Sequence, residues 1–141
     1  MRERNIEVVR SWIDEAWSRG NLALADDLLA EEFVLHDPVA SREIVGRDAE
    51  RALITGLREA IPDLTFAIDD LVADGDNVTI RWTAAGTHGG ELLGFLATGR
   101  ALAIRGVDMY RLQDGRITES WTFWDLPGML RTVSAPVAAS A

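Results

Sequence analysis

Cysteine is absent from the 141-residue chain. This absence excludes disulfide bonds, a thiolate nucleophile, and zinc or iron–sulfur sites held by cysteine. It also fits the reducing environment of the cytoplasm. The opening stretch MRERNIEVVRSW has no apolar run of the signal-peptide type, and no segment of the chain is apolar over a membrane-spanning length. We therefore expect a cytoplasmic protein without a membrane partner.

Basic residues are scarce, with Lys+Arg 14 against Asp+Glu 23 and a formal net charge of −9. Such a surface repels phosphate backbones and anionic lipid, so nucleic acid is not an expected partner. Hydrophobic residues make up 48% of the chain, which suffices for one core. We predict a single domain over residues 1–133, followed by a flexible tail of small residues, SAPVAASA, at 134–141.

Motifs for cofactor and hydrolase chemistry are also missing. The chain contains no GxGxxG, GxxxxGK[ST], GxSxG or HExxH sequence. The Gly-rich stretch GTHGGELLG follows a predicted strand without opening a clear helix, so it is not expected to bind phosphate. The sequence therefore predicts neither a cofactor nor a metal ion.

The first half of the chain shows helical spacing of apolar residues. Helices are predicted at 3–19, 21–30 and 46–63, the third broken at Pro62. A short extended piece at 33–38 separates the second helix from the third. These elements predict an N-terminal layer of three helices.

From Leu64 the apolar residues recur at every second position, which is typical of strands. Hairpins are predicted at 65–88, turning at 74–77, and at 101–123, turning at Asp114–Gly115. Residues 91–100 read as a loop or strand edge, and 125–133 as a short closing helix. The predicted fold class is α+β, with helices packed on one face of a strongly bent antiparallel sheet.

The alternation of side chains along a strand predicts which residues face the core. Asp108 shares its parity with Ile104, Tyr110 and Leu112, so we expect it to point inward. A buried carboxylate is costly unless it is paired, and burial raises its pKa toward the range of a general base. The alternative is a structural Asp that a backbone group or an Arg satisfies.

The two histidines of the chain, His36 and His88, are candidate partners for Asp108. A carboxylate beside an imidazole orients the ring and raises its basicity. His88 has the parity of the apolar set in its strand, which includes Trp82 and Ala84. Either histidine could instead be a hydrogen-bonded residue of the rim or core. Asp125, just before Leu126 and Pro127, is predicted to cap the closing helix.

Several words of the sequence, taken together, resemble the SnoaL-like polyketide cyclases, also called ester cyclases, of the NTF2-like superfamily. The words are WSRGNLALADDLLAEEFVLHDP, AIPDLTFAIDDLVADGDNVTIRWTAAGTHGGELLG, ATGR, DMYRLQDGRITESW and DLPGMLRTV, and the resemblance runs from about residue 5 to 133. It implies a cone-shaped fold with a hydrophobic pocket between the bent sheet and the helices. It also implies a dimer or tetramer built through the sheet.

The resemblance further implies a set of site residues. The cyclases close a ring by aldol condensation without a cofactor, using an Asp of the last strand as acid and base, and that Asp falls at Thr122. A His of the preceding strand falls at Asp108, the His of the GTHGG word at His88, and an Asn near His36. An aromatic residue that ends the first helix falls at Trp17. A threonine is no general base near neutral pH, so the resemblance leaves Asp108 as the base with His88 or His36 as its partner.

Three functions follow as hypotheses. The first is a cofactor-independent enzyme that moves protons on a small apolar, polyketide-like or cyclic ketone substrate. The second is a non-catalytic protein that binds a small ligand in the same pocket. The third is a hydrolase that opens an epoxide with water held between Asp108 and a second acid, Asp125 or Asp70. The residues expected to line the pocket are Trp17, Trp82, Tyr110, Thr122 and Trp124.

Overall fold

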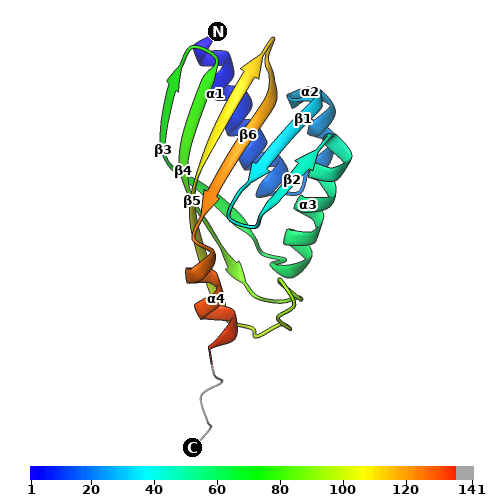
Figure 1. Ribbon diagram of the computed structural model, residues 1–141, viewed down its shortest axis with the longest axis vertical. Helices are drawn as coiled ribbons and strands as arrows, with labels where there is room; N and C mark the ends of the chain where they lie inside the picture. Colours follow the sequence, from blue (N-terminus) through cyan, green and yellow to red (C-terminus); the bar gives the residue numbers. More distant parts are fainter. Residues whose placement is uncertain (136–141) are drawn as a thin grey trace, which may run out of the picture.

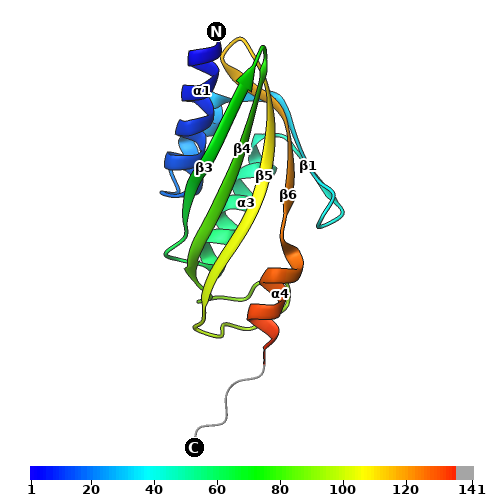
Figure 2. The same ribbon diagram turned by 90° about the vertical axis from the view of Figure 1, so that its left-hand side faces the viewer.

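The computed structural model describes residues 1–135 as helices packed on one face of a curved sheet (Figures 1 and 2). The predicted α+β class is confirmed. Residues 136–141 of the predicted tail lie outside the described residues, and Ser134, which we assigned to the tail, instead ends the last helix. Among the described residues, no helix is long and apolar enough to cross a membrane.

The N-terminal layer contains three helical segments, as predicted. The first is α1 (Arg2–Ser11), which continues without a break into a π-helix, η1 (Trp12–Trp17). The second consists of a 3₁₀ turn, Leu22–Leu24, and α2 (Ala25–Leu28). It ends two residues earlier than predicted because Leu29 already pairs with the sheet. The third is α3 (Arg47–Ala60), which stops before Pro62.

The sheet has six strands in the order β2-β1-β6-β5-β4-β3. Its strands are β1 (Leu29–Asp37), β2 (Arg42–Val45), β3 (Thr65–Asp74), β4 (Asn77–Thr87), β5 (Ala101–Gln113) and β6 (Arg116–Trp124). Strand β2 was not predicted. The sheet is also not wholly antiparallel, since β1 runs parallel to β6. The β5–β6 hairpin turns at Asp114 and Gly115, both at positive φ, as a two-residue turn requires.

The core lies between the inner face of the sheet and the helices. Its largest fully buried side chains include Trp12, Phe33, Ile54, Ile80 and Ile117. The closing helix α4 (Leu126–Ser134) sits beyond the end of β6, at the lower end of the molecule in Figure 1. Its N-cap is Asp125, whose Oδ1 accepts a hydrogen bond from the Gly128 amide (2.9 Å), as predicted. Asp125 is therefore occupied with capping.

Within residues 1–135, no helix covers the outer face of the sheet (Figure 2). Exposed apolar side chains lie on it, including Val107, Met109 and Phe123, which are 37%, 46% and 47% exposed. Strand parity sets this pattern, because these residues alternate with inward-facing neighbours such as Asp108 and Thr122.

Candidate active site

A cavity of about 360 Å³ opens between the inner face of the sheet and the helices. Most of its walls are apolar, supplied by η1, α3, the inner strands and α4. Representative apolar lining residues are Ile13, Leu53, Leu57, Ala84, Ile104 and Met129. The polar side chains in its walls include Asp37, Arg42, Asp108 and Thr122. A mostly apolar hollow with a few converging polar groups is the usual form of a small-molecule site.

Three aromatic rings form one wall of the cavity. Trp17 meets Phe66 edge to face (centroids 5.4 Å apart), and Phe66 meets Trp82 at 5.2 Å. The Arg58 guanidinium fixes the end of η1 by donating to the carbonyls of Trp17 (2.9 Å) and Ser18 (2.7 Å). The segment η1 is a π-helix, and both Ile13 and Trp17 of this helix line the cavity.

Asp108 points from the middle of β5 into the cavity, as its parity predicted. The Tyr110 hydroxyl donates a hydrogen bond to its Oδ2 (2.8 Å). Its Oδ1 is buried and has no hydrogen-bond partner among residues 1–135. Burial raises the pKa of Asp108, while the nearby Thr122, Trp82 and Tyr110 partly oppose the rise. Oδ1 thus faces the cavity without a well-formed hydrogen bond within residues 1–135, and the Thr122 and Trp82 side chains lie close enough to the carboxylate to lower its pKa.

The indole of Trp82 lies beside Asp108 with its own donor unused. Trp82 Nε1 is buried and has no hydrogen-bond partner in the described part of the chain. The ring lies over Gly106, its cross-strand partner, where a Cβ atom would overlap the indole. Only glycine leaves room for this ring position. The cavity therefore presents an unused acceptor and an unused donor at neighbouring positions.

A second polar group in the cavity wall is fully satisfied. Asp37 Oδ1 accepts from Trp124 Nε1 (3.0 Å) and the Ala40 amide (3.1 Å), and its Oδ2 accepts from Arg42 Nε (3.0 Å). Asp37 is 1% exposed, and it faces Arg42 across the β1–β2 pair. Trp124 thus lines the cavity with its indole nitrogen already engaged. This cluster ties β1 to β2 and engages both carboxylate oxygens of Asp37, whereas Asp108 is a buried acid of the cavity wall with no cationic partner among residues 1–135.

Glu50 is an acid that sequence reasoning missed. It lies in the first turn of α3 and is only 1% exposed. Burial, and then the negative charge of Asp108, raise the pKa of Glu50 to about 8. The signal that could have revealed it is helical spacing, since Glu50 precedes the apolar Leu53, Ile54 and Leu57 on one face of the helix.

His36 lies on the outer face of the sheet, outside the cavity. Its Nδ1 bonds Glu43 (2.7 Å), its Nε2 bonds Glu119 (2.6 Å), and its ring stacks on Trp121 at 5.4 Å. The two carboxylates, Glu119 first, raise the pKa of His36. Leu35 and Asp37 line the cavity instead, because neighbours on a strand point to opposite faces. The structure thus does not bring His36 to Asp108.

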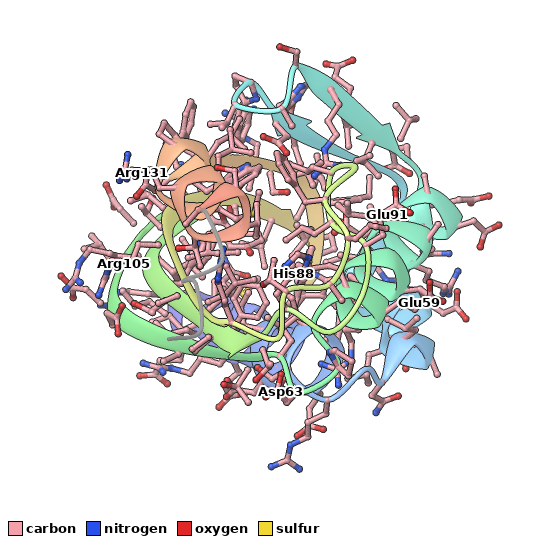
Figure 3. The ribbon with its side chains drawn as sticks, turned by 90° about the horizontal axis from the view of Figure 1, so that it is seen from below. Glu59, Asp63, His88, Glu91, Arg105 and Arg131 are labelled. Atoms are coloured by element: carbon pink, nitrogen blue, oxygen red, sulfur yellow. The ribbon has the colours of Figure 1, made fainter. Side chains whose placement is uncertain are left out.

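His88 is fully buried but lies apart from Asp108. Seen from below, it projects near the centre of the fold, while Arg105 and Arg131 lie at the edge (Figure 3). Asp108 pairs with Ile80 near the start of β4, and His88 follows the end of that strand, so the two are on the order of 20 Å apart. Its Nδ1 accepts from the Thr98 amide (3.3 Å) and contacts Thr98 Oγ1 (2.9 Å). The predicted dyad of His88 and Asp108 is not formed.

The remaining predicted residues divide in two. Trp17, Trp82, Thr122 and Trp124 line the cavity with Asp108. Tyr110 does not, since it stands behind Asp108 as a hydrogen-bond donor and is 3% exposed. In residues 1–135, no three His, Asp or Glu side chains converge as a metal-ligand set. The chemistry that this arrangement can perform by itself is proton transfer at Asp108.

Comparison with known proteins shows which family the chain belongs to. Residues 7–133 match the SnoaL-like polyketide cyclases. The chain belongs to the SnoaL-like polyketide cyclase family. The resemblance drawn from the sequence is therefore confirmed, and with it the NTF2-like fold.

Individual proteins are similar to this chain along most of their length. The aklanonic acid methyl ester cyclase DauD of Streptomyces sp. strain C5 is 29% identical over 93% of this chain and 82% of its own. A protein from Jannaschia sp. CCS1 assigned to the SnoaL-like polyketide cyclases has a TM-score of 0.89 at 25% identity, covering 96% of this chain and 95% of that one. One from Acidithiobacillus ferrooxidans, assigned as a polyketide cyclase, has a TM-score of 0.84 at 30% identity, covering 95% and 96%.

Proposed function

We propose that this SnoaL-like protein is a cofactor-independent enzyme that transfers protons on a small, apolar, polyketide-like or cyclic ketone substrate. The observation that carries the proposal is the pairing of Asp108 Oδ1 with Trp82 Nε1, both buried and without a partner among residues 1–135. The acceptor can take a proton from carbon, and the donor can hold the oxygen on which charge develops.

The reaction begins when Asp108 removes a proton from the carbon beside a ketone. The enolate oxygen would lie against Trp82 Nε1 and the Thr122 hydroxyl, which stand on either side of Asp108 in the sheet. In a cyclisation the enolate carbon attacks a second carbonyl of the same molecule, and the new alkoxide takes the proton back from Asp108. Protons and electrons balance within the substrate, so the step needs no oxidant, reductant or cofactor.

The surroundings of Asp108 suit a general base. Burial raises its pKa, which makes it a stronger base than an exposed carboxylate, and Tyr110 holds its other oxygen in place. The pKa of Tyr110 is itself raised well above its usual value by burial and by Asp108, so the phenol stays a donor. Since His36 and His88 lie elsewhere, Trp82 and Thr122 would donate hydrogen bonds to the substrate oxygen in place of the histidine expected from sequence.

The experiment is an exchange assay in D₂O with aklanonic acid methyl ester, the compound named for DauD, and with simple cyclic 1,3-diketones as smaller probes. Deuterium incorporation beside the carbonyl, faster than in buffer alone, is the expected result. A cyclised product from the ester would extend the activity to ring closure. Binding of these compounds without any exchange above background would contradict the proposal.

That negative outcome would favour a second function, a ligand-binding protein that does no chemistry. Thr122 favours it, because it stands where the family resemblance places the catalytic carboxylate. Epoxide opening is a weaker alternative. The acids expected to assist Asp108 in it, Asp125 and Asp70, cap a helix and face solvent, while Asp37 is occupied by three donors. Oxygen from ¹⁸O-labelled water in a diol product would nevertheless establish epoxide hydrolysis.

We also propose that the protein forms a homo-oligomer through the outer face of the sheet. Val107, Met109 and Phe123 expose apolar surface there, and the family resemblance implies assembly through the sheet. Sedimentation analysis is expected to show a dimer or tetramer. A Phe123→Glu variant should dissociate it, and a wild-type protein that sediments as a monomer at micromolar concentration would contradict this.

A further inference from the structure

Glu50 has no part in the proposed proton transfer, although it lies on α3, whose Leu53 and Leu57 line the cavity with Asp108. It does not line the cavity, it is 1% exposed, and its Oε2 has no hydrogen-bond partner among residues 1–135. It sits one turn before Leu53 and Ile54 on the apolar face of α3. A carboxyl group in such a place is stable only when it is neutral or paired.

The groups around Glu50 do not offer it a partner. Asp108 and Tyr110 act on it from β5, and Arg42 acts on it from β2. The Arg42 guanidinium is engaged through Nε with Asp37 of β1 (3.0 Å). The region thus contains three carboxyl groups and one guanidinium. If all three were ionised, two negative charges would stand uncompensated in an apolar interior, which is expensive.

Hydrogen bonding decides which carboxyl keeps a proton. Asp37 accepts three hydrogen bonds. Asp108 accepts one from Tyr110, and Thr122 and Trp82 also lower its pKa, whereas no hydrogen bond reaches the side chain of Glu50 within the described chain. Glu50 is therefore the carboxyl whose ionised form is least stabilised. Accordingly, burial and the Asp108 charge raise the pKa of Glu50 to about 8, so it is neutral at pH 7.

We propose that Glu50 is a positioning residue that acts through its proton: neutral Glu50 leaves Asp108 as the buried carboxylate of the site without a cationic partner among residues 1–135, and ionised Glu50 switches the site off. The inference rests on the proposed function, because it assigns to Glu50 the control of the Asp108 base. A second negative charge would oppose both the Asp108 carboxylate and the enolate formed beside it. Glu50 touches neither substrate nor the reacting atoms.

The consequence is a bell-shaped pH profile. The rising limb reports ionisation of Asp108, and the falling limb reports ionisation of Glu50. At pH 9, one unit above about 8, roughly a tenth of the molecules keep the Glu50 proton, so wild-type exchange should fall about tenfold from its plateau. The Glu50→Gln variant keeps a neutral side chain of the same shape and should stay within about twofold of its plateau.

The test measures deuterium exchange between pH 5 and 9.5 for the wild type, Glu50→Gln and a matched control, Glu59→Gln. Glu59 lies on the same helix but is exposed, at the edge of the view in Figure 3. The control should keep the wild-type falling limb. Loss of that limb in Glu50→Gln alone supports the proposal, and an unchanged falling limb in Glu50→Gln overturns it.

Two further readouts do not depend on turnover. Ionised 4-nitrophenol, an enolate mimic whose absorbance reports its charge, should bind the wild type about tenfold more weakly at pH 9 than it binds Glu50→Gln. This comparison still tests Glu50 if the protein catalyses no exchange at all, so the two proposals fail separately. Should Glu50→Gln not fold, ¹³C NMR of wild-type protein labelled at the glutamate carboxyl should show one resonance titrating near pH 8. Its absence would overturn the proposal.

Discussion

The ionisable groups on the two sides of the sheet differ in how fully they are hydrogen-bonded. On the outer face, His36 is bonded at both ring nitrogens, to Glu43 and Glu119, and stacks on Trp121. On the inner side, Asp108 and Glu50 each keep a buried oxygen without a partner among residues 1–135. The outer group is satisfied by its neighbours and stabilises the fold. The inner groups cost stability and remain available to a ligand, which is the expected signature of a functional site.

Of the ionisable groups on the two faces, we expect Glu50 to have the largest effect on the pH dependence of stability. In the folded protein Glu50 keeps its proton up to about pH 8, and in the unfolded chain only up to about 4.5. The folded state therefore binds the extra proton between these values. The resulting stabilisation is fully present below pH 4.5 and is lost as the pH rises through 8.

Relative to Glu50→Gln, the wild type should thus lose roughly 3–5 kcal/mol of unfolding free energy between pH 5 and pH 9. Urea denaturation at the two pH values measures this, with Glu59→Gln as the exposed control on the same helix. If the unfolding free energies of the wild type and Glu50→Gln change in parallel with pH, Glu50 is not a destabilising buried acid. The proposed difference between the two faces would then be wrong.

The next effect is expected at Trp82. Replacing it with Phe keeps most of the apolar ring surface and removes the unused Nε1 donor. Loss of one donor to a developing oxyanion costs about 10²-fold in rate. The exchange assay should show this loss in Trp82→Phe, while Trp121→Phe on the outer face should stay within about twofold. Equal losses in the two variants would show that the faces do not differ in function.

A smaller effect is expected at His36. Its pKa is raised in the folded protein, so its contribution to stability is fully present below about 6.5 and is lost as the pH passes through the raised value. A partly exposed bridge of this kind is worth about 1 kcal/mol. His36→Gln should therefore be less stable than the wild type by about that amount at pH 5.5 and by little at pH 9, as urea unfolding would measure. A larger difference at pH 9 than at pH 5.5 would contradict the assigned bridge.

Much of the fold could be predicted from local sequence patterns. Period-two apolar spacing identified both long hairpins, and the turn residues Asp114 and Gly115 identified the second reversal. The short strand β2 was missed because its four residues show no lasting alternation. The parallel pairing of β1 with β6 could not be predicted from parity, since it joins segments far apart in sequence.

The sequence predicted a site residue correctly where the alternation along a single strand determines which way its side chain points. Parity alone placed Asp108 inward, since β5 is long and regular. The placement of His36 beside Asp108 came from the family resemblance and was wrong, because Asp37, one residue on, holds the inward position in β1. Glu50 was missed because the significance of an acid on an apolar helix face depends on which strands pack against it, and sequence spacing does not give that.

The most direct test of the inner-face base is the deuterium-exchange rate of Asp108→Asn beside His36→Asn, both measured at pH 7 on folded protein. Each variant replaces one ionisable side chain by the same amide, one on each face of the sheet. A missing general base costs about 10²–10⁴-fold, so Asp108→Asn should lose exchange by that factor while His36→Asn stays within about threefold. Exchange by Asp108→Asn at the wild-type rate would contradict the assignment of Asp108 as the base.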